Sequence, residues 1–179
     1  MRAAVPPTVF LDFDDVICLN RNYGGHSVFS PDAPDELWER LFHPPAVEVL
    51  RELVDEFSPR FVLTTNWVRR VDRDGVADLL SRGGLIFLPG CLHDQWQAPT
   101  MTGRERREAI EAWIHLHHQG EPFVVVDDER SGADLTRSVF HADGRLVLCK
   151  PGEGLHRGYL PQIRSALTRS PESHEGARP

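Results

Sequence analysis

Two short clusters of acidic residues each follow an apolar run in this sequence. Residues 11–16 read Leu-Asp-Phe-Asp-Asp-Val, and residues 125–129 read Val-Val-Asp-Asp-Glu. Carboxylates spaced this closely repel one another unless a positive charge lies between them. If the two apolar runs are neighbouring strands, up to six acidic side chains meet at one edge of a sheet. A divalent cation that prefers oxygen ligands, Mg²⁺ above all, would relieve the repulsion, and Mn²⁺ suits the same ligands.

Each cluster alone has a simpler interpretation, because Asp is common in turns and as a helix N-cap after a strand. The two clusters together, both at the ends of apolar runs, favour the metal site. A third apolar run ends in Thr64-Thr65-Asn66, where hydroxyl groups could donate hydrogen bonds to a phosphoryl oxygen. Threonine is also an ordinary N-cap residue, so this run decides nothing by itself.

Five brief apolar runs are the predicted strands, and they would bring the polar residues together. They span residues 9–13, 61–65, 85–88, 123–126 and 146–149. Each is continuous and often β-branched, which is typical of strands buried on both faces of a parallel sheet. In such sheets, ligands bind beyond the carboxyl ends of the strands, where these polar residues lie.

Amphipathic helical patterns lie between the predicted strands. One helix opens after Pro44-Pro45, a second opens with a capping box at residues 102–105 and buries Trp113, and a last one opens at Pro161. The alternation predicts an α/β fold: a three-layer, Rossmann-like domain with a central, mainly parallel, five-stranded sheet. We expect one domain over residues 1–169 and a disordered tail over residues 170–179, which are polar and rich in Pro, Gly and Ser.

The bulk properties exclude some classes of protein. The net charge of −7 over 179 residues argues against broad electrostatic capture of nucleic acid, although a local basic groove is compatible with it. Three scattered cysteines do not make a disulfide framework, and we interpret them as reduced thiols of a cytoplasmic protein. No stretch has the length of a membrane span or a signal peptide, so we expect no membrane partner.

The order of these motifs carries a family resemblance. Asp-x-Asp-x-Val after one strand, Thr after the next and Asp-Asp after a later one resemble motifs one, two and four of the haloacid-dehalogenase (HAD) superfamily. The resemblance runs from about residue 9 to residue 167. More narrowly, residues 42–47 (Phe-His-Pro-Pro-Ala-Val), 64–67 (Thr-Thr-Asn-Trp) and the pair Gly154-Leu155 are similar to the compact HAD domains of Swiss-army-knife RNA-repair proteins.

The resemblance implies a mechanism and a Mg²⁺ cofactor. Asp12 would attack phosphorus and form an aspartyl-phosphate. Asp14 would protonate the leaving oxygen and then activate water, and its backbone carbonyl would bind the metal ion. We expect the chain to turn sharply after Phe13, so that both carboxylates can face one pocket.

The same resemblance implies roles for the other two strand ends. Thr64 would hydrogen-bond the transferring phosphoryl group, with Thr65 as the alternative, and Thr65 and Asn66 would contact the substrate. Asp128 is the expected second metal carboxylate, with Asp127 close behind it, orienting either the ion or a basic side chain.

Two residues depart from the family pattern. Asp15 stands where a Gly is usual, and we expect it to keep the left-handed turn, which Asp tolerates better than most residues. The usual motif-three Lys is missing, and we assign its role to Arg106, whose guanidinium could bridge Asp12 and the phosphate. A solvated first helical turn explains an Arg here equally well, and Lys150 is a less favoured substitute.

Residues 18–42 occupy the place of a HAD cap and predict a short cap or lid with one helix around Leu37, Trp38 and Leu41. Trp67 is interpreted as a packing residue. The leading functional hypothesis is a phosphatase acting on a phosphomonoester. A nucleic-acid end-processing phosphatase and a catalytically weak binding protein are the alternatives, and the sequence does not indicate an oligomeric state.

Overall fold

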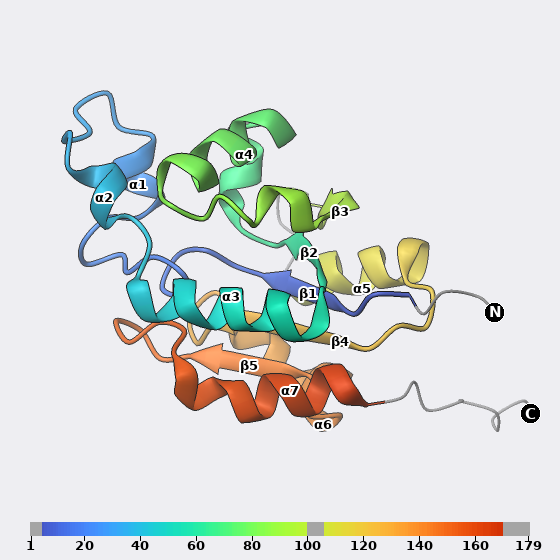
Figure 1. The fold of residues 1–179 in the computed structure, drawn as a ribbon. Coiled ribbons are helices and arrows are strands. Elements are labelled where there is room, and N and C mark those ends of the chain that lie inside the picture. The colour runs from blue at the N-terminus through green and yellow to red at the C-terminus, as the bar shows by residue number, and fades with distance from the viewer. Residues whose placement is uncertain (1–4, 100–105, 170–179) are drawn as a thin grey trace, which may run out of the picture.

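The computed structural model describes residues 5–99 and 106–169. Its strands form one parallel sheet in the order β3-β2-β1-β4-β5 (Figure 1). The strands are β1 (Thr8–Leu11), β2 (Arg60–Leu63), β3 (Leu92–Gln97), β4 (Phe123–Asp128) and β5 (Leu146–Cys149). The expected α/β fold is confirmed, and every pairing in this sheet is parallel.

Helices connect the strands. The α-helices are α1 (Gly25–Val28), α2 (Leu37–Arg40), α3 (Pro44–Phe57), α4 (Arg73–Arg82), α5 (Arg106–His117), α6 (Val139–Ala142) and α7 (Leu160–Thr168). Short 3₁₀ helices follow four of the loops: η1 (Asn66–Arg69), η2 (Pro89–Cys91), η3 (Ala133–Arg137) and η4 (Arg157–Tyr159). The helices expected after Pro44 and at Pro161 are confirmed, and proline lies in the first turn of both. The capping box expected at residues 102–105 lies outside the described residues.

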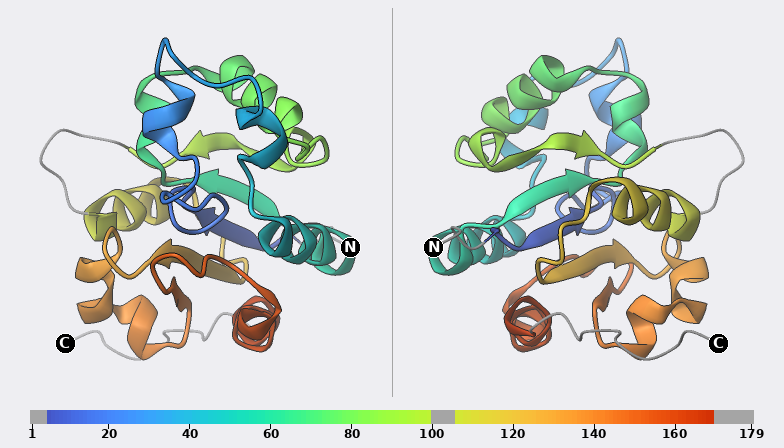
Figure 2. Two further views of the ribbon diagram at one scale, coloured as in Figure 1. Left: turned by 90° about the vertical axis from the view of Figure 1, so that its left-hand side faces the viewer. Right: turned by 90° about the vertical axis from the view of Figure 1, so that its right-hand side faces the viewer.

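The sheet is the middle of three layers, because its strands bury alternate side chains on opposite faces. On β1, Val9 and Leu11 join the apolar core that includes α3, α4 and α7. Phe10 points to the other face and joins the core formed with α5, η3 and α6. Trp113 is fully buried there, edge-on to the ring of Phe10 at 5.2 Å. Figure 2 shows the helices on either side of the sheet.

The strand expected at residues 85–88 is wrong. Leu85 and Leu88 are fully buried, but the chain turns between them, with Leu88 N donating to Leu85 O. The third strand is instead β3, which lies at the edge of the sheet. It buries Leu92 and exposes Asp94, Gln95 and Gln97. An edge strand needs no continuous apolar run, so its sequence carries little of the signal that marks the central strands.

The segment between β1 and α3 carries the expected sharp turn. Phe13 O accepts hydrogen bonds from the amides of Val16, Ile17 and Cys18, and Asp15 adopts a φ of 57°. The expectation that Asp15 keeps the left-handed turn is confirmed. The rest of the segment, with α1 and α2, lies beyond the carboxyl ends of the strands, beside η1 and α4 (Figures 1 and 2).

Candidate active site

Three carboxylates from two neighbouring strands meet at the carboxyl edge of the sheet. Asp12 follows β1, and Asp127 and Asp128 end β4, its parallel neighbour, in a register that pairs Leu11 with Val126. Each offers one oxygen, and these three oxygens lie within 4.8 Å of one another. All three residues are buried. The strand order reverses between β1 and β4, which is where open α/β sheets bind their ligands.

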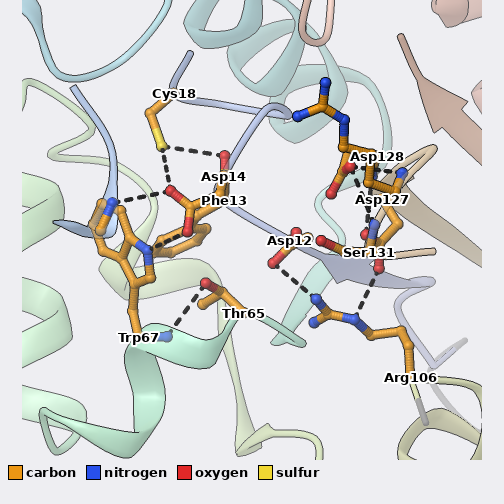
Figure 3. Close-up of polar contacts among 12 residues, drawn as sticks. Asp12, Phe13, Asp14, Cys18, Thr65, Trp67, Arg106, Asp127, Asp128 and Ser131 are labelled. Atoms are coloured by element: carbon orange, nitrogen blue, oxygen red, sulfur yellow. Dashed lines mark hydrogen bonds and ion pairs between the residues drawn. The ribbon is translucent and has the colours of Figure 1, made fainter. Parts of the chain in front are cut away.

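Arg106, the first residue of α5, supplies one positive charge to this cluster (Figure 3). Its Nη2 lies 3.4 Å from Asp12 Oδ1 and its Nε lies 3.1 Å from Asp127 Oδ2. The Arg106 side chain is 9% exposed, so the ion pairs are poorly screened by solvent. The alternative interpretation from sequence was an Arg in a solvated first helical turn. Arg106 is instead buried against two carboxylates.

Burial dominates the electrostatics of the cluster. It raises the pKa of Asp12 from 3.8 to about 6, although the charge of Arg106 acts in the opposite direction. Burial, together with the charge of Asp12, also raises the pKa of Asp127 well above its ordinary value. If all three carboxylates were ionised, the one guanidinium would leave a net charge of about −2 in this buried site.

These residues fit a divalent cation. The cluster offers hard oxygen donors from three carboxylates, its remaining charge is the one that Mg²⁺ would neutralise, and it lies at the position where a ligand is expected. Within residues 5–99 and 106–169, it is the one group of three or more acidic, His or Cys residues close enough to hold an ion. Asp128 also orders the following loop, because its Oδ1 accepts from the amides of Arg130 and Ser131.

Asp14 faces away from the cluster, toward the indole of Trp67 (Figure 3). Its Oδ2 accepts from Trp67 Nε1 at 2.9 Å, and its Oδ1 accepts from Gly25 N at 3.0 Å and from Cys18 Sγ at 3.6 Å. Trp67 is 2% exposed and packs edge-on against Phe13. Trp67 therefore has a second role besides the expected packing, because its indole N–H donates a hydrogen bond to a candidate catalytic carboxylate.

The other acidic residues also leave the cluster. Asp15 is buried, and its carboxylate accepts from the backbone and side-chain nitrogens of Asn20. Glu129 is exposed. Three of the six acidic side chains therefore meet, and the additional carboxylate at position 15 stabilises its own turn instead of adding charge to the cluster.

The Thr-Thr-Asn run divides into different environments. Thr64 is buried, and its Oγ1 has no hydrogen-bond partner among the described residues. Thr65 Oγ1 accepts from Trp67 N and caps η1. Asn66 is exposed at the start of η1, and Lys150 is exposed after β5. The unpaired hydroxyl of Thr64 is the feature of this run that indicates a ligand, since a buried polar group without a partner is costly.

A family model for the HAD domain in Swiss Army Knife RNA repair proteins matches residues 8–159. The chain belongs to this family. No curated protein and no solved structure matches the chain significantly. None of the helices in the described part of this HAD domain is long and apolar enough to cross a membrane.

The three motifs at residues 42–47, 64–67 and 154–155, which carried the resemblance in the sequence, all contact the loop after β1. Besides the contact of Trp67 with Asp14, His43 N donates to Ile17 O at 2.7 Å, and Leu155 N donates to Val16 O at 2.8 Å. Gly154 has a φ of 66°, and a Cβ there would lie 3.1 Å from Val16 O. In this chain, these residues therefore position the loop that carries Asp12 and Asp14.

Proposed function

We propose that this HAD domain is a Mg²⁺-dependent phosphatase that hydrolyses a phosphomonoester through an aspartyl-phosphate on Asp12. The observation that carries the proposal is the buried cluster in which Arg106 bridges the carboxylates of Asp12 and Asp127, with Asp128 close to both. Family membership suggests a hydrolase, and the cluster supplies a nucleophile together with charges that complement a phosphoryl group.

Asp12 is the nucleophile in this proposal. Its Oδ attacks phosphorus, the bond from phosphorus to the ester oxygen breaks, and the phosphoryl group becomes attached to Asp12. Arg106 pairs with Asp12 and would also bind a phosphoryl oxygen, so it holds the carboxylate and offsets charge in the transition state. Thr64 Oγ1 would donate to a second phosphoryl oxygen, which would give its buried hydroxyl a partner.

Asp14 is the proposed acid and base. It gives its proton to the leaving oxygen, and it then takes a proton from the water that attacks the aspartyl-phosphate, which releases phosphate and regenerates Asp12. Its contacts with Trp67 and Gly25 hold the carboxylate away from Asp12. We also assign substrate contacts to Thr65 and Asn66; Asn66 lines the pocket beside Asp14.

Asp12, Asp127, Asp128 and the backbone carbonyl of Asp14 are the groups that would hold Mg²⁺. The bound ion would supply positive charge that lowers the repulsion between the anionic nucleophile and the anionic ester. In the same proposal, residues 18–42 form a short cap in a single domain over residues 1–169. The three cysteines are free thiols, which is in keeping with the reducing cytoplasm that we expect.

A nucleic-acid end is a second candidate substrate, because the matching family is described from RNA repair proteins. The net charge of −7 weighs against binding a long nucleic acid but permits a terminal phosphate to enter a small site. Hydrolysis of a 3′- or 5′-phosphorylated oligonucleotide at a higher kcat/KM than that of the corresponding mononucleotide would favour this candidate.

Hydrolysis of 4-nitrophenyl phosphate tests the proposed function. We expect turnover with Mg²⁺, its loss in EDTA and its loss in Asp12→Asn, with Asp55→Asn, a surface substitution on α3, as the control. Absence of turnover across a broad panel of phosphate esters, or full activity of Asp12→Asn, would contradict the proposal.

A further inference from the structure

A pocket of about 330 Å³ lies on the far side of Asp14 from the acidic cluster. Asp14 forms one part of its wall, and the others are Gly25, His26, Phe29, Asn66, Trp67 and Arg70. The pocket therefore lies between α1 and η1, two short elements that follow β1 and β2. If Asp14 protonates the leaving oxygen, the remainder of the leaving group extends toward this side of the site.

Arg70 is exposed and supplies the guanidinium of this pocket. Its guanidinium lies over the ring of Phe29, 5.2 Å from the centroid, and within the described residues it has no carboxylate within ion-pair distance. The Phe29 ring also packs edge-on against Trp67. The cation is thereby held at the pocket by an aromatic wall and keeps its N–H donors available, since a ring face neutralises no charge.

The other charged group of the pocket, Asp14, is not paired with Arg70. Its carboxylate accepts from Trp67, Gly25 and Cys18 instead. His26 and Asn66 add polar groups that can donate hydrogen bonds. In a chain with a net charge of −7, this pocket thus has, beside its candidate acid, a guanidinium whose donors can bind a negative group. Glycine at position 25 keeps the pocket wall in place, because a Cβ there would lie 2.5 Å from Trp67 Nε1.

We propose that this pocket binds the leaving group and that Arg70 selects leaving groups carrying a second anionic group, such as a carboxylate or a phosphodiester. The inference rests on the proposed phosphatase function and specifies its substrate class. Arg70 is a specificity-determining residue in this proposal, and its bidentate N–H pair would contact the second anion and not the transferring phosphoryl group.

Matched substrates test the preference. We expect kcat/KM for 4-carboxyphenyl phosphate to exceed that for the neutral 4-carbamoylphenyl phosphate by about tenfold, which corresponds to one charge-assisted contact at an exposed site. Arg70→Gln should bring the ratio close to one, and Arg70→Lys should keep part of it. Arg69→Gln, which changes the exposed neighbour outside the pocket, should leave the ratio as in the wild type. The same ratio in wild type and Arg70→Gln would overturn the proposal.

Two further measurements complete the test. Thymidine 3′-phosphate and the dinucleotide ending in the same 3′-phosphate differ by a phosphodiester. The ratio of their kcat/KM values, measured in wild type and in Arg70→Gln, shows whether Arg70 recognises a phosphodiester as well as a carboxylate. An inert enzyme would refute the proposed function alone. In that case calorimetry can compare 4-carboxybenzylphosphonate with its carbamoyl analogue, since neither can be hydrolysed. Tighter binding of the carboxylate compound by the wild type, but not by Arg70→Gln, supports the proposal. Equal binding of the two compounds by the wild type overturns it.

Discussion

Asp12 and Asp14 are two residues apart on one loop, yet they lie in contrasting surroundings (Figure 3). Asp12 is buried among charges, with Arg106 and two further carboxylates around it. Asp14 is partly buried and is held by neutral donors, the Trp67 indole and the Gly25 amide. The turn at Phe13 and Asp15 separates the two side chains.

The contrast indicates how a single loop supports two kinds of chemistry. A carboxylate among charges responds to any change in those charges, so the state of Asp12 depends on Arg106 and on a bound cation. A carboxylate held by neutral hydrogen bonds keeps its geometry when those charges change. We therefore expect substitutions around Asp12 to affect phosphoryl transfer as a whole, and substitutions around Asp14 to affect proton transfer to and from particular substrates.

Replacing the nucleophile should have the largest effect. In Asp12→Asn we expect kcat/KM to fall on the order of 10³-fold or more, because the amide cannot form the acyl phosphate. The loss should be similar for 4-nitrophenyl phosphate and for an alkyl phosphate, since both require the same attack. A steady-state comparison of the two substrates measures this, and a loss confined to one of them would argue against a nucleophilic role.

Replacing the proposed acid should separate the two substrates. Asp14→Asn should lower the turnover of an alkyl phosphate by about 10²- to 10⁴-fold, because a poor leaving oxygen needs a proton. Release of 4-nitrophenolate needs no proton, so the first half-reaction with 4-nitrophenyl phosphate should be much less affected. Rapid-mixing measurement of nitrophenolate release shows which half-reaction slows, and equal losses for both substrates in the first half-reaction would contradict the assignment.

Removing the positive charge should destabilise the metal-free protein. With Arg106→Gln in EDTA we expect a loss of about 3–5 kcal/mol at pH 7.5, because buried carboxylates lose their partner. Burial raises the pKa of Asp12 from 3.8 to about 6, so the folded state takes up its proton first. Its stability relative to the unfolded chain therefore falls as pH rises through that window.

The loss of unfolding free energy in Arg106→Gln should consequently become smaller as pH is lowered from 7.5 toward 5, because the carboxylates take up protons. Urea denaturation at both pH values measures the change, and Mg²⁺ should recover part of the stability at pH 7.5. Arg107→Gln, whose side chain pairs with exposed Glu111, is the matched control. A loss of unfolding free energy that is independent of pH would show that the ion pairs do not stabilise the cluster.

The smallest expected effect comes from the indole that holds Asp14. Trp67→Phe keeps a ring beside Phe13 and Phe29 but removes the Nε1–H donor. We expect kcat for an alkyl phosphate to fall about tenfold, with a shifted pH–rate profile, because general acid–base catalysis depends on a positioned group. Trp96→Phe on β3 controls for loss of an indole. An unchanged pH profile would reduce Trp67 to a packing residue.

The sequence predicted the fold through its central strands. β1, β2 and β4 are continuous apolar runs because both faces of the sheet are covered, and their order placed Asp12 beside Asp127 and Asp128 once the strands were taken as neighbours. β3 was missed for the converse reason: an edge strand contacts solvent, and Leu92–Gln97 carries His, Asp and Gln. Leu85 and Leu88 are buried in a turn, and burial alone does not distinguish a turn from a strand.

The site was predicted by residue but not by orientation. A sequence shows that Asp12, Asp14 and Asp15 are close along the chain, but their side chains diverge because the turn after Phe13 sends each to a different partner. The partners of Asp14 and Asp15, Trp67 and Asn20, follow from backbone geometry that no spacing encodes. The Thr-x-x-Trp run was the one signal for Trp67, and only as a family resemblance.

Trapping the covalent intermediate tests the proposed mechanism most directly. Asp14→Asn should form the aspartyl-phosphate from 4-nitrophenyl phosphate and Mg²⁺ but hydrolyse it slowly, so the intermediate accumulates. Acid quenching, borohydride reduction and peptide mass spectrometry should then find homoserine at position 12, together with a burst of nitrophenolate stoichiometric with enzyme. A burst without modification of residue 12, or a phosphorylated residue elsewhere, would contradict the assignment of Asp12 as the nucleophile.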